Sequence, residues 1–226
     1  MDPWYRLSKQ ILRFYLAACI KKIHVIGQEN LHPGPKIIVA NHPNLTDGFV
    51  LPFVIQEKLH FLIQSETFNI PFLRLLLTKA DQIPVVRERG REALKTALDK
   101  LSTGKVIVIF PEGKLSHGKK LHRGRSGAAV LALMSGAPII PVGFYIPPEN
   151  IQMLTGRIHN RISKAFFQIR GECYVRIGKP WNVPQSNGAE FNPNVLRNLT
   201  NKIMSQIVNL IGQTREEAQR SKENLI

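Results

Sequence analysis

Hydrophobic residues follow two patterns along this chain, short continuous runs and longer stretches with polar residues between the apolar ones. Continuous β-branched runs are typical of strands buried on both faces, and three- and four-residue spacing is typical of amphipathic helices. Strands are predicted at residues 23–27, 36–40, 59–63, 82–85, 106–110 and 138–144, with two more around Gly171 within 165–178. Helices are predicted at residues 4–20, 45–56, 68–77 (beginning near Pro71), 87–101, 127–135 and 195–211.

The alternation of strands and helices predicts the fold class. It favours an α/β domain with a central mixed, largely parallel sheet flanked by helices. A chain of 226 residues is long enough for one sizeable core. We therefore expect an N-terminal amphipathic helix at 1–22, a single α/β domain at 23–212 and a polar C-terminal tail at 213–226, frayed from Thr214.

The first helix carries apolar residues on one side and mostly polar ones on the other. Three basic residues interrupt it, so it predicts no membrane span, and it lacks the continuous apolar core of a secretory signal. Two interpretations remain, a helix lying in the headgroup region of an anionic membrane and a helix packed on the core. The first assigns membrane contact to Trp4, Tyr5, Arg6, Lys9, Ile11, Arg13 and Phe14.

Composition narrows the possible partners. A formal net charge of +15 indicates an anionic partner such as a membrane surface, a phosphorylated substrate or an acidic carrier. Nucleic acid is not expected, because no zinc-finger, basic-zipper or RNA-binding signature accompanies the charge. Cys19 and Cys173 lie far apart and predict neither a disulfide framework nor a zinc site. We expect no metal and no cofactor.

The first candidate for chemistry follows the apolar run 36–40. His42 stands five positions before Asp47, and Pro43 disfavours a helical conformation at His42, so we expect a strand, a turn and then a helix. A carboxylate that orients an imidazole makes it a general base. The alternative is structural, with Asn44 capping the helix and Asp47 completing a variant of the capping box.

Three further segments carry polar residues at positions suited to a site. Glu112 and Gly113 follow the most buried strand directly, where α/β sheets present functional groups. Arg87 closes the extended segment 83–86 and is suited to bidentate phosphate binding. The loop 114–125 is the most basic part of the chain and favours anion binding. Each also has an ordinary interpretation, as a turn glutamate, a solvated arginine and a solvated loop.

The basic loop also matches the pattern GxxxxGK of a phosphate-binding loop at residues 113–119. The residue that follows is Lys120, where magnesium binding requires Ser or Thr. Residues 120–127 are also a poor start for a helix. Nucleotide binding is therefore the weaker interpretation of this loop.

Taken together, four segments resemble the HxxxxD-type glycerolipid acyltransferase family, typified by bacterial lysophosphatidic acid acyltransferases. The segments are residues 42–47, 83–87, 110–113 and 137–142, in the order and with the separations of the family's blocks. The resemblance extends over about residues 23–180. It implies that His42, oriented by Asp47, removes a proton from a glycerol hydroxyl, which attacks the thioester of acyl-CoA or acyl carrier protein without an acyl-enzyme intermediate.

The resemblance also implies an acceptor site. Arg87 and Arg125 would bind the acceptor's phosphate, and Glu112 and Gly113 would line the same site. The leading acceptor is 1-acyl-glycerol-3-phosphate, which would give phosphatidic acid. It further implies a peripheral or monotopic protein on the cytoplasmic face of a bacterial cell membrane.

Two departures from the family pattern leave the acceptor open. Asn44 stands where the family often has Ser, and Lys114 with Leu115 stands where Thr-Arg is common. Asn44 and Lys114 are both expected to contact the acceptor. Another lysolipid, glycerol 3-phosphate or a different headgroup is the alternative substrate, and a non-catalytic anionic-lipid-binding protein is the alternative of another class.

Overall fold

The computed structural model describes residues 2–117, 120–158, 161–186 and 192–223. A seven-stranded sheet has the order β1-β9-β6-β2-β5-β3-β4, and every pair except β6–β9 is parallel. The strands are β1 Lys22–Ile26, β2 Lys36–Ala40, β3 Leu59–Gln64, β4 Ile83–Val85, β5 Val106–Ile109, β6 Ile139–Tyr145 and β9 Glu172–Ile177. The predicted class, a mixed and mostly parallel α/β sheet, is confirmed.

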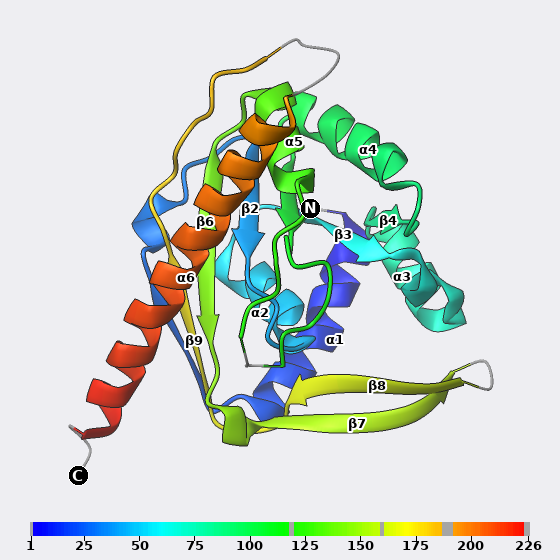
Figure 1. The fold of residues 1–226 in the computed structure, drawn as a ribbon. Helices are drawn as coiled ribbons and strands as arrows, with labels where there is room; N and C mark the ends of the chain where they lie inside the picture. The colour runs from blue at the N-terminus through cyan, green and yellow to red at the C-terminus, as the bar shows by residue number, and fades with distance from the viewer. Residues whose placement is uncertain (1, 118–119, 159–160, 187–191, 224–226) are drawn as a thin grey trace.

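Helices cover both faces of the sheet (Figure 1). They are α1 Pro3–Cys19, α2 Thr46–Val54, α3 Pro71–Lys79, α4 Gly90–Ser102, α5 Gly127–Ser135 and α6 Pro193–Glu223. Short 3-10 turns occupy Gln28–Asn30, Ser65–Asn69 and Pro148–Asn150. Ile38 and Ala40 pack with α1 and α2, whereas Ile37 and Val39 pack with α4, α5 and α6. Two buried faces explain why the central strands are apolar at every position.

The C-terminal helix is longer than predicted, and the expected frayed end is wrong for residues 214–223. Thr214 and Ala218 are buried and continue the stripe that includes Ile207. Glu217 forms an ion pair with Arg176 of β9, which fixes this part of the helix on the sheet. Helical periodicity therefore persists through a segment whose polar composition suggested a tail.

One element was not predicted. Strand β7 Ile151–Ile158 pairs antiparallel with β8 Arg161–Gln168 to form a separate two-stranded hairpin. The hairpin lies below the carboxyl ends of β2 and β6 in Figure 1. Its backbone reaches the loop after β2, where the Leu45 N–H donates to the Phe166 carbonyl at 2.9 Å. The end of β8 and all of β9 fall within the segment 165–178, where two strands were predicted, but β8 pairs with β7 outside the main sheet.

Candidate active site

The segment after β2 brings His42 and Asp47 together. The strand ends at Ala40, α2 begins at Thr46, and the turn between them sets His42 Nδ1 3.1 Å from Asp47 Oδ2. The Asp47 side chain is fully buried, while 17% of the His42 side chain is exposed. An imidazole held from behind by a buried carboxylate presents its other nitrogen, Nε2, outward.

The capping arrangement is present as well. The Asn44 N–H donates to the same Asp47 oxygen at 3.0 Å, and Asn44 Oδ1 accepts from the Thr46 N–H at 2.8 Å. The two interpretations of this segment therefore occur together. The Asn44 side chain is fully buried, so this structure gives it a local structural role and argues against the predicted contact with the acceptor.

Burial raises the pKa of Asp47 from 3.8 to about 6, against the opposing effects of the His42 hydrogen bond and charge. The carboxylate is consequently ionised only above that pH. In its ionised form it accepts a hydrogen bond from the Nδ1–H of His42, and the Nε2 of that tautomer has a free lone pair. This is the tautomer that a general base requires.

The plane of the imidazole is fixed by aromatic packing. The ring stacks on Phe110 with 3.9 Å between centroids and 10° between planes. Phe110 in turn packs against Phe61 of β3 at 6.4 Å. These contacts add to the Asp47 hydrogen bond and leave the ring a single orientation.

Glu112 links the histidine loop to the basic loop. Its Oε1 accepts from the His42 N–H at 3.0 Å and its Oε2 from the His122 N–H at 2.8 Å. The Ser116 N–H adds a third link by donating to the His42 carbonyl at 2.8 Å. The Glu112 carboxylate is buried and bound to main chain on both oxygens, so it positions His42. Lining of the acceptor site by Glu112 stays a prediction.

Gly113 and Arg125 lie against each other. Gly113 has a φ of +64°, and a Cβ there would lie 2.8 Å from Nε of Arg125. The Arg125 N–H donates to the Pro111 carbonyl at 2.8 Å, which anchors this exposed arginine beside the end of β5. Only glycine therefore permits both the turn and the approach of the guanidinium.

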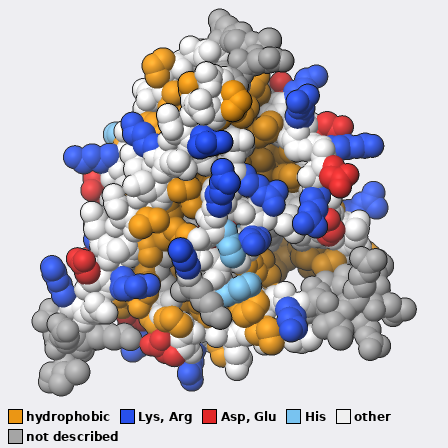
Figure 2. Space-filling view, viewed as in Figure 1, with side chains coloured by type: hydrophobic (Ala, Val, Ile, Leu, Met, Phe, Trp, Pro, Cys, Tyr) orange, Lys and Arg blue, Asp and Glu red, His pale blue; other side chains and the backbone are white. Residues whose placement is uncertain are grey.

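Arg87 and Lys114 are both exposed. Arg87 follows β4, which lies three positions from β2 in the sheet, a lateral separation of roughly 14 Å. Both residues lie at the carboxyl edge of the parallel strands, as does His42. Figure 2 shows Lys and Arg side chains gathered around the histidines at the centre of this face.

Comparison with known proteins identifies the family. The acyltransferase family model matches residues 22–145, which is more than half of the chain. The chain belongs to the acyltransferase family. This region contains His42, Asp47, Arg87, Glu112 and Arg125.

The named relatives of this acyltransferase family member align with part of the chain. A 1-acyl-sn-glycerol-3-phosphate acyltransferase of Chlamydomonas reinhardtii is 32% identical over 62% of this chain and 45% of its own. One of Borreliella burgdorferi is 32% identical over 62% of this chain and 59% of its own. The chain thus spans about half the length of these relatives. The solved 1-acyl-sn-glycerophosphate acyltransferase PlsC of Thermotoga maritima has the same fold, with a TM-score of 0.65, 21% identity and coverage of 95% of this chain and 78% of that one.

Helix α1, which precedes the part matched by the acyltransferase family, presents apolar side chains outward. Leu7, Ile11 and Phe14 are exposed, Phe14 at 78%, and neighbouring α3 exposes Phe72 and Leu75. None of the helices in the described ranges combines the length and apolar character needed to cross a bilayer. Contact of this exposed face with a membrane stays a prediction.

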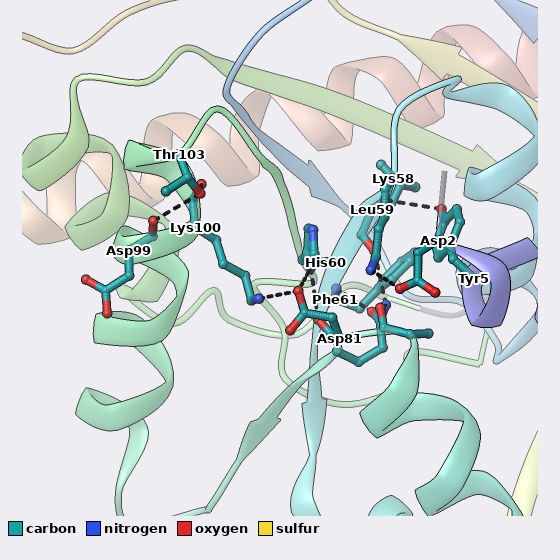
Figure 3. A network of polar contacts seen from close by, with 12 residues as sticks. Asp2, Tyr5, Lys58, Leu59, His60, Phe61, Asp81, Asp99, Lys100 and Thr103 are labelled. Atoms are coloured by element: carbon teal, nitrogen blue, oxygen red, sulfur yellow. Dashed lines mark hydrogen bonds and ion pairs between the residues drawn. The ribbon is translucent and has the colours of Figure 1, made fainter.

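The prediction that Tyr5 contacts the membrane is wrong. It is buried, and its hydroxyl accepts from the Leu59 N–H at 3.1 Å (Figure 3). Beside it, Lys58 Nζ donates to Asp2 at 2.8 Å, so two contacts hold the start of α1 on β3. Lys9 is partly buried over the Phe53 ring, whereas Arg6 and Arg13 are exposed and Trp4 is intermediate.

Several residues of the site left no signal in the sequence. Ser116 and His122 contribute through contacts with main chain, which residue patterns do not reveal. Tyr15 of α1 donates to the Gln168 carbonyl at 2.6 Å and lies 2.8 Å from Thr46 Oγ1. In the described residues, no cluster of three or more His, Cys, Asp or Glu side chains could hold a metal ion.

Proposed function

We propose that this protein transfers a fatty acyl group from a thioester donor to the free hydroxyl of 1-acyl-glycerol-3-phosphate, giving phosphatidic acid. The observation that carries the proposal is the His42–Asp47 pair, with its carboxylate buried and its imidazole partly exposed. The names of the relatives support this choice of acceptor. A protein that only binds lipid would have no need of an oriented base.

The reaction proceeds in one displacement. His42 Nε2 removes the hydroxyl proton as the oxygen attacks the thioester carbonyl carbon, and Asp47 stabilises the imidazolium that forms. The tetrahedral intermediate then breaks its carbon–sulfur bond. The sulfur leaves with the proton from the imidazolium, so the base is restored and the new ester is the product.

The acceptor's phosphate is the natural ligand of the exposed arginines. Arg125 is anchored beside the end of β5 and Arg87 follows β4, so both belong to the edge that carries His42. Guanidinium groups bind phosphate in a bidentate manner, which would fix the distance between the phosphate and the reacting hydroxyl. Lys114 adds a further positive charge beside Gly113.

We propose that the protein acts at the surface of an anionic membrane, on its cytoplasmic face in a bacterium, as a peripheral or monotopic protein. The exposed face of α1 and the net charge of +15 support this location. The donor is acyl-CoA or acyl carrier protein, both of which carry negative charge.

A panel of acceptors tests the proposal. The protein is mixed with vesicles of phosphatidylglycerol, radiolabelled acyl-CoA or acyl carrier protein, and one acceptor: lysophosphatidic acid, lysophosphatidylcholine or glycerol 3-phosphate. The expected result is label in phosphatidic acid, with at least tenfold less product from the other acceptors. Label in another product would reassign the acceptor, and vesicle binding without transfer from either donor would favour the non-catalytic alternative.

A further inference from the structure

A concave site lies beside the basic loop, next to the segment that carries His42. It is a groove of about 540 Å³ between that loop, the end of β6 and one face of α6. Its lining includes Asn41 and Pro43, the neighbours of His42 in sequence. The His42 ring is not part of this lining and stacks on Phe110 after β5. The groove therefore begins beside the catalytic pair without being part of it.

Three cationic side chains line the groove. Lys120 and Arg123 come from the basic loop and Arg215 from α6, where it lies 5.5 Å above the ring of Tyr145. Across the described part of the chain none of the three forms an ion pair, and the groove lining contains no Asp or Glu. Unneutralised cations from two separate elements are suited to a phosphate.

The walls of the groove are apolar. Met204, Val208 and Ile211 recur on one face of α6 with Arg215 one turn further, and the wall from Met204 to Arg215 is roughly 16 Å long. Phe144 and Ile146 at the end of β6 also line the groove. Val208 is half exposed, whereas Leu199, Ile203 and Ile207 of the same helix are buried. Figure 2 shows hydrophobic side chains between Lys and Arg on this face.

The groove is rigidly connected to the catalytic loop. Asn41 Nδ2 donates to the Phe144 carbonyl at 2.9 Å, and the Phe144 N–H donates to Asn41 Oδ1 at 2.7 Å. On the opposite wall, a Cβ at Gly124 would lie 2.6 Å from Cγ of Met204, so the basic loop is seated directly on α6. These contacts fix both walls of the groove relative to the segment that carries His42.

We propose that this groove binds the phosphate-bearing arm of the acyl donor, an inference that rests on the proposed acyl transfer. In the acceptor the phosphate is only a few bonds from the reacting hydroxyl, so it requires cations close to the His42 ring. In a thioester donor a long pantetheine arm separates the sulfur from the phosphate. An extended groove that begins beside His42 and carries Lys120, Arg123 and Arg215 matches that separation. The phosphates of the two substrates then bind at separate cationic sites.

Charge reversal at Arg215 tests the proposal, with Arg220 as the matched control. Both arginines are exposed on α6, and only Arg215 lines the groove. We expect Arg215→Glu to raise the donor KM at least tenfold and to leave kcat and the acceptor KM within twofold. Lys120→Glu is expected to act in the same direction, and Arg220→Glu to change neither constant. Unchanged donor KM in both groove variants would overturn the proposal.

Binding measured without turnover separates this inference from the proposed function. Calorimetric titration with free CoA and with holo acyl carrier protein gives Kd values for the wild type and the variants. Weaker binding of both in Arg215→Glu identifies the shared phosphopantetheine arm, and weaker binding of one identifies that carrier as the source. If the groove binds CoA but the protein shows no transferase activity, this inference stands and the proposed reaction is wrong. Active enzyme whose affinities for CoA and for acyl carrier protein are both unchanged in Arg215→Glu and Lys120→Glu would support the proposed reaction and remove this inference.

Discussion

In the described part of the protein, two histidines are paired with aspartates, and their environments are opposite. At the carboxyl edge of the sheet, Asp47 is fully buried and His42 is partly exposed. In β3, His60 is only 1% exposed while its partner Asp81 is 53% exposed. His60 Nδ1 lies 2.9 Å from the Asp81 carbonyl and 3.4 Å from its carboxylate, which also accepts from Lys100 at 2.6 Å (Figure 3).

The comparison shows that the buried member of the pair determines what the pair can do. Burial lowers the pKa of His60, so the imidazole is held neutral inside the protein and no substrate can reach it. Burial raises the pKa of Asp47, and the imidazole that it orients faces outward. A general base needs the second arrangement, because proton transfer requires contact with the substrate.

The largest expected effect is on His42. His42→Ala removes the base, and we expect kcat to fall by about 10³-fold. His60→Ala is the matched control, because it removes the other paired imidazole. Product formation from radiolabelled donor measures both, and circular dichroism checks that each variant is folded. A decrease of less than tenfold in His42→Ala would contradict the proposed role.

Replacing Asp47 comes next. Asp47→Asn keeps the size of the side chain but loses the charge that stabilises the imidazolium, so we expect kcat to fall by about 10²-fold or more. The wild-type kcat/KM should decline as pH falls through about 6, the pKa of Asp47. A pH–rate profile measures this decline. An acid limb that persists at the same pH in the residual activity of Asp47→Asn would assign it to another group.

The same pKa has a consequence for stability. Because the folded-state pKa of Asp47 is raised above 3.8, its contribution is fully present below that pH and is lost as pH rises through about 6. The free energy of unfolding of the wild type, relative to that of Asp47→Asn, should therefore decrease as pH rises from 3.8 to about 6. Urea denaturation at several pH values measures the difference, and a difference that is independent of pH would contradict the raised pKa.

A smaller effect is expected at Glu112. The two carboxylate oxygens of Glu112 each accept a hydrogen bond from a main-chain N–H. Glu112→Gln replaces one of these oxygens by an NH2 group, which places a hydrogen-bond donor opposite one of the N–H groups. We expect kcat to fall about tenfold and the free energy of unfolding to fall by about 1–3 kcal/mol. A large increase in the acceptor KM with kcat unchanged would instead favour the predicted contact with the acceptor.

The smallest effect on activity is expected at His60. His60→Ala removes a buried side chain and its hydrogen bond, so the free energy of unfolding should fall by about 1–3 kcal/mol. The kcat of the folded variant should remain within twofold of the wild type. Thermal unfolding and activity at a temperature well below the transition measure the two quantities. A strong loss of activity would show that the two pairs are not functionally distinct.

Much of the fold could be predicted because its signals are local. The continuous apolar runs gave the sheet strands, and the residues around His42 and Asp47 gave the strand, turn and helix that bring the pair together. Tyr5 was misplaced because the rotation of α1 depends on contacts with distant parts of the chain, such as those of Tyr5 with Leu59 and of Tyr15 with Gln168, which no periodicity encodes. The β7–β8 hairpin was missed because its strands pair with each other and meet the site through main chain, at Leu45 and Phe166.

The doubly used oxygen of Asp47 has a consequence for local opening of the helix. Oδ2 accepts from the Asn44 N–H at the start of α2 and lies within hydrogen-bond distance of His42. The start of that helix and the orientation of the base therefore depend on the same atom. Local opening at the start of α2 would release the base as well, while the sheet stays folded.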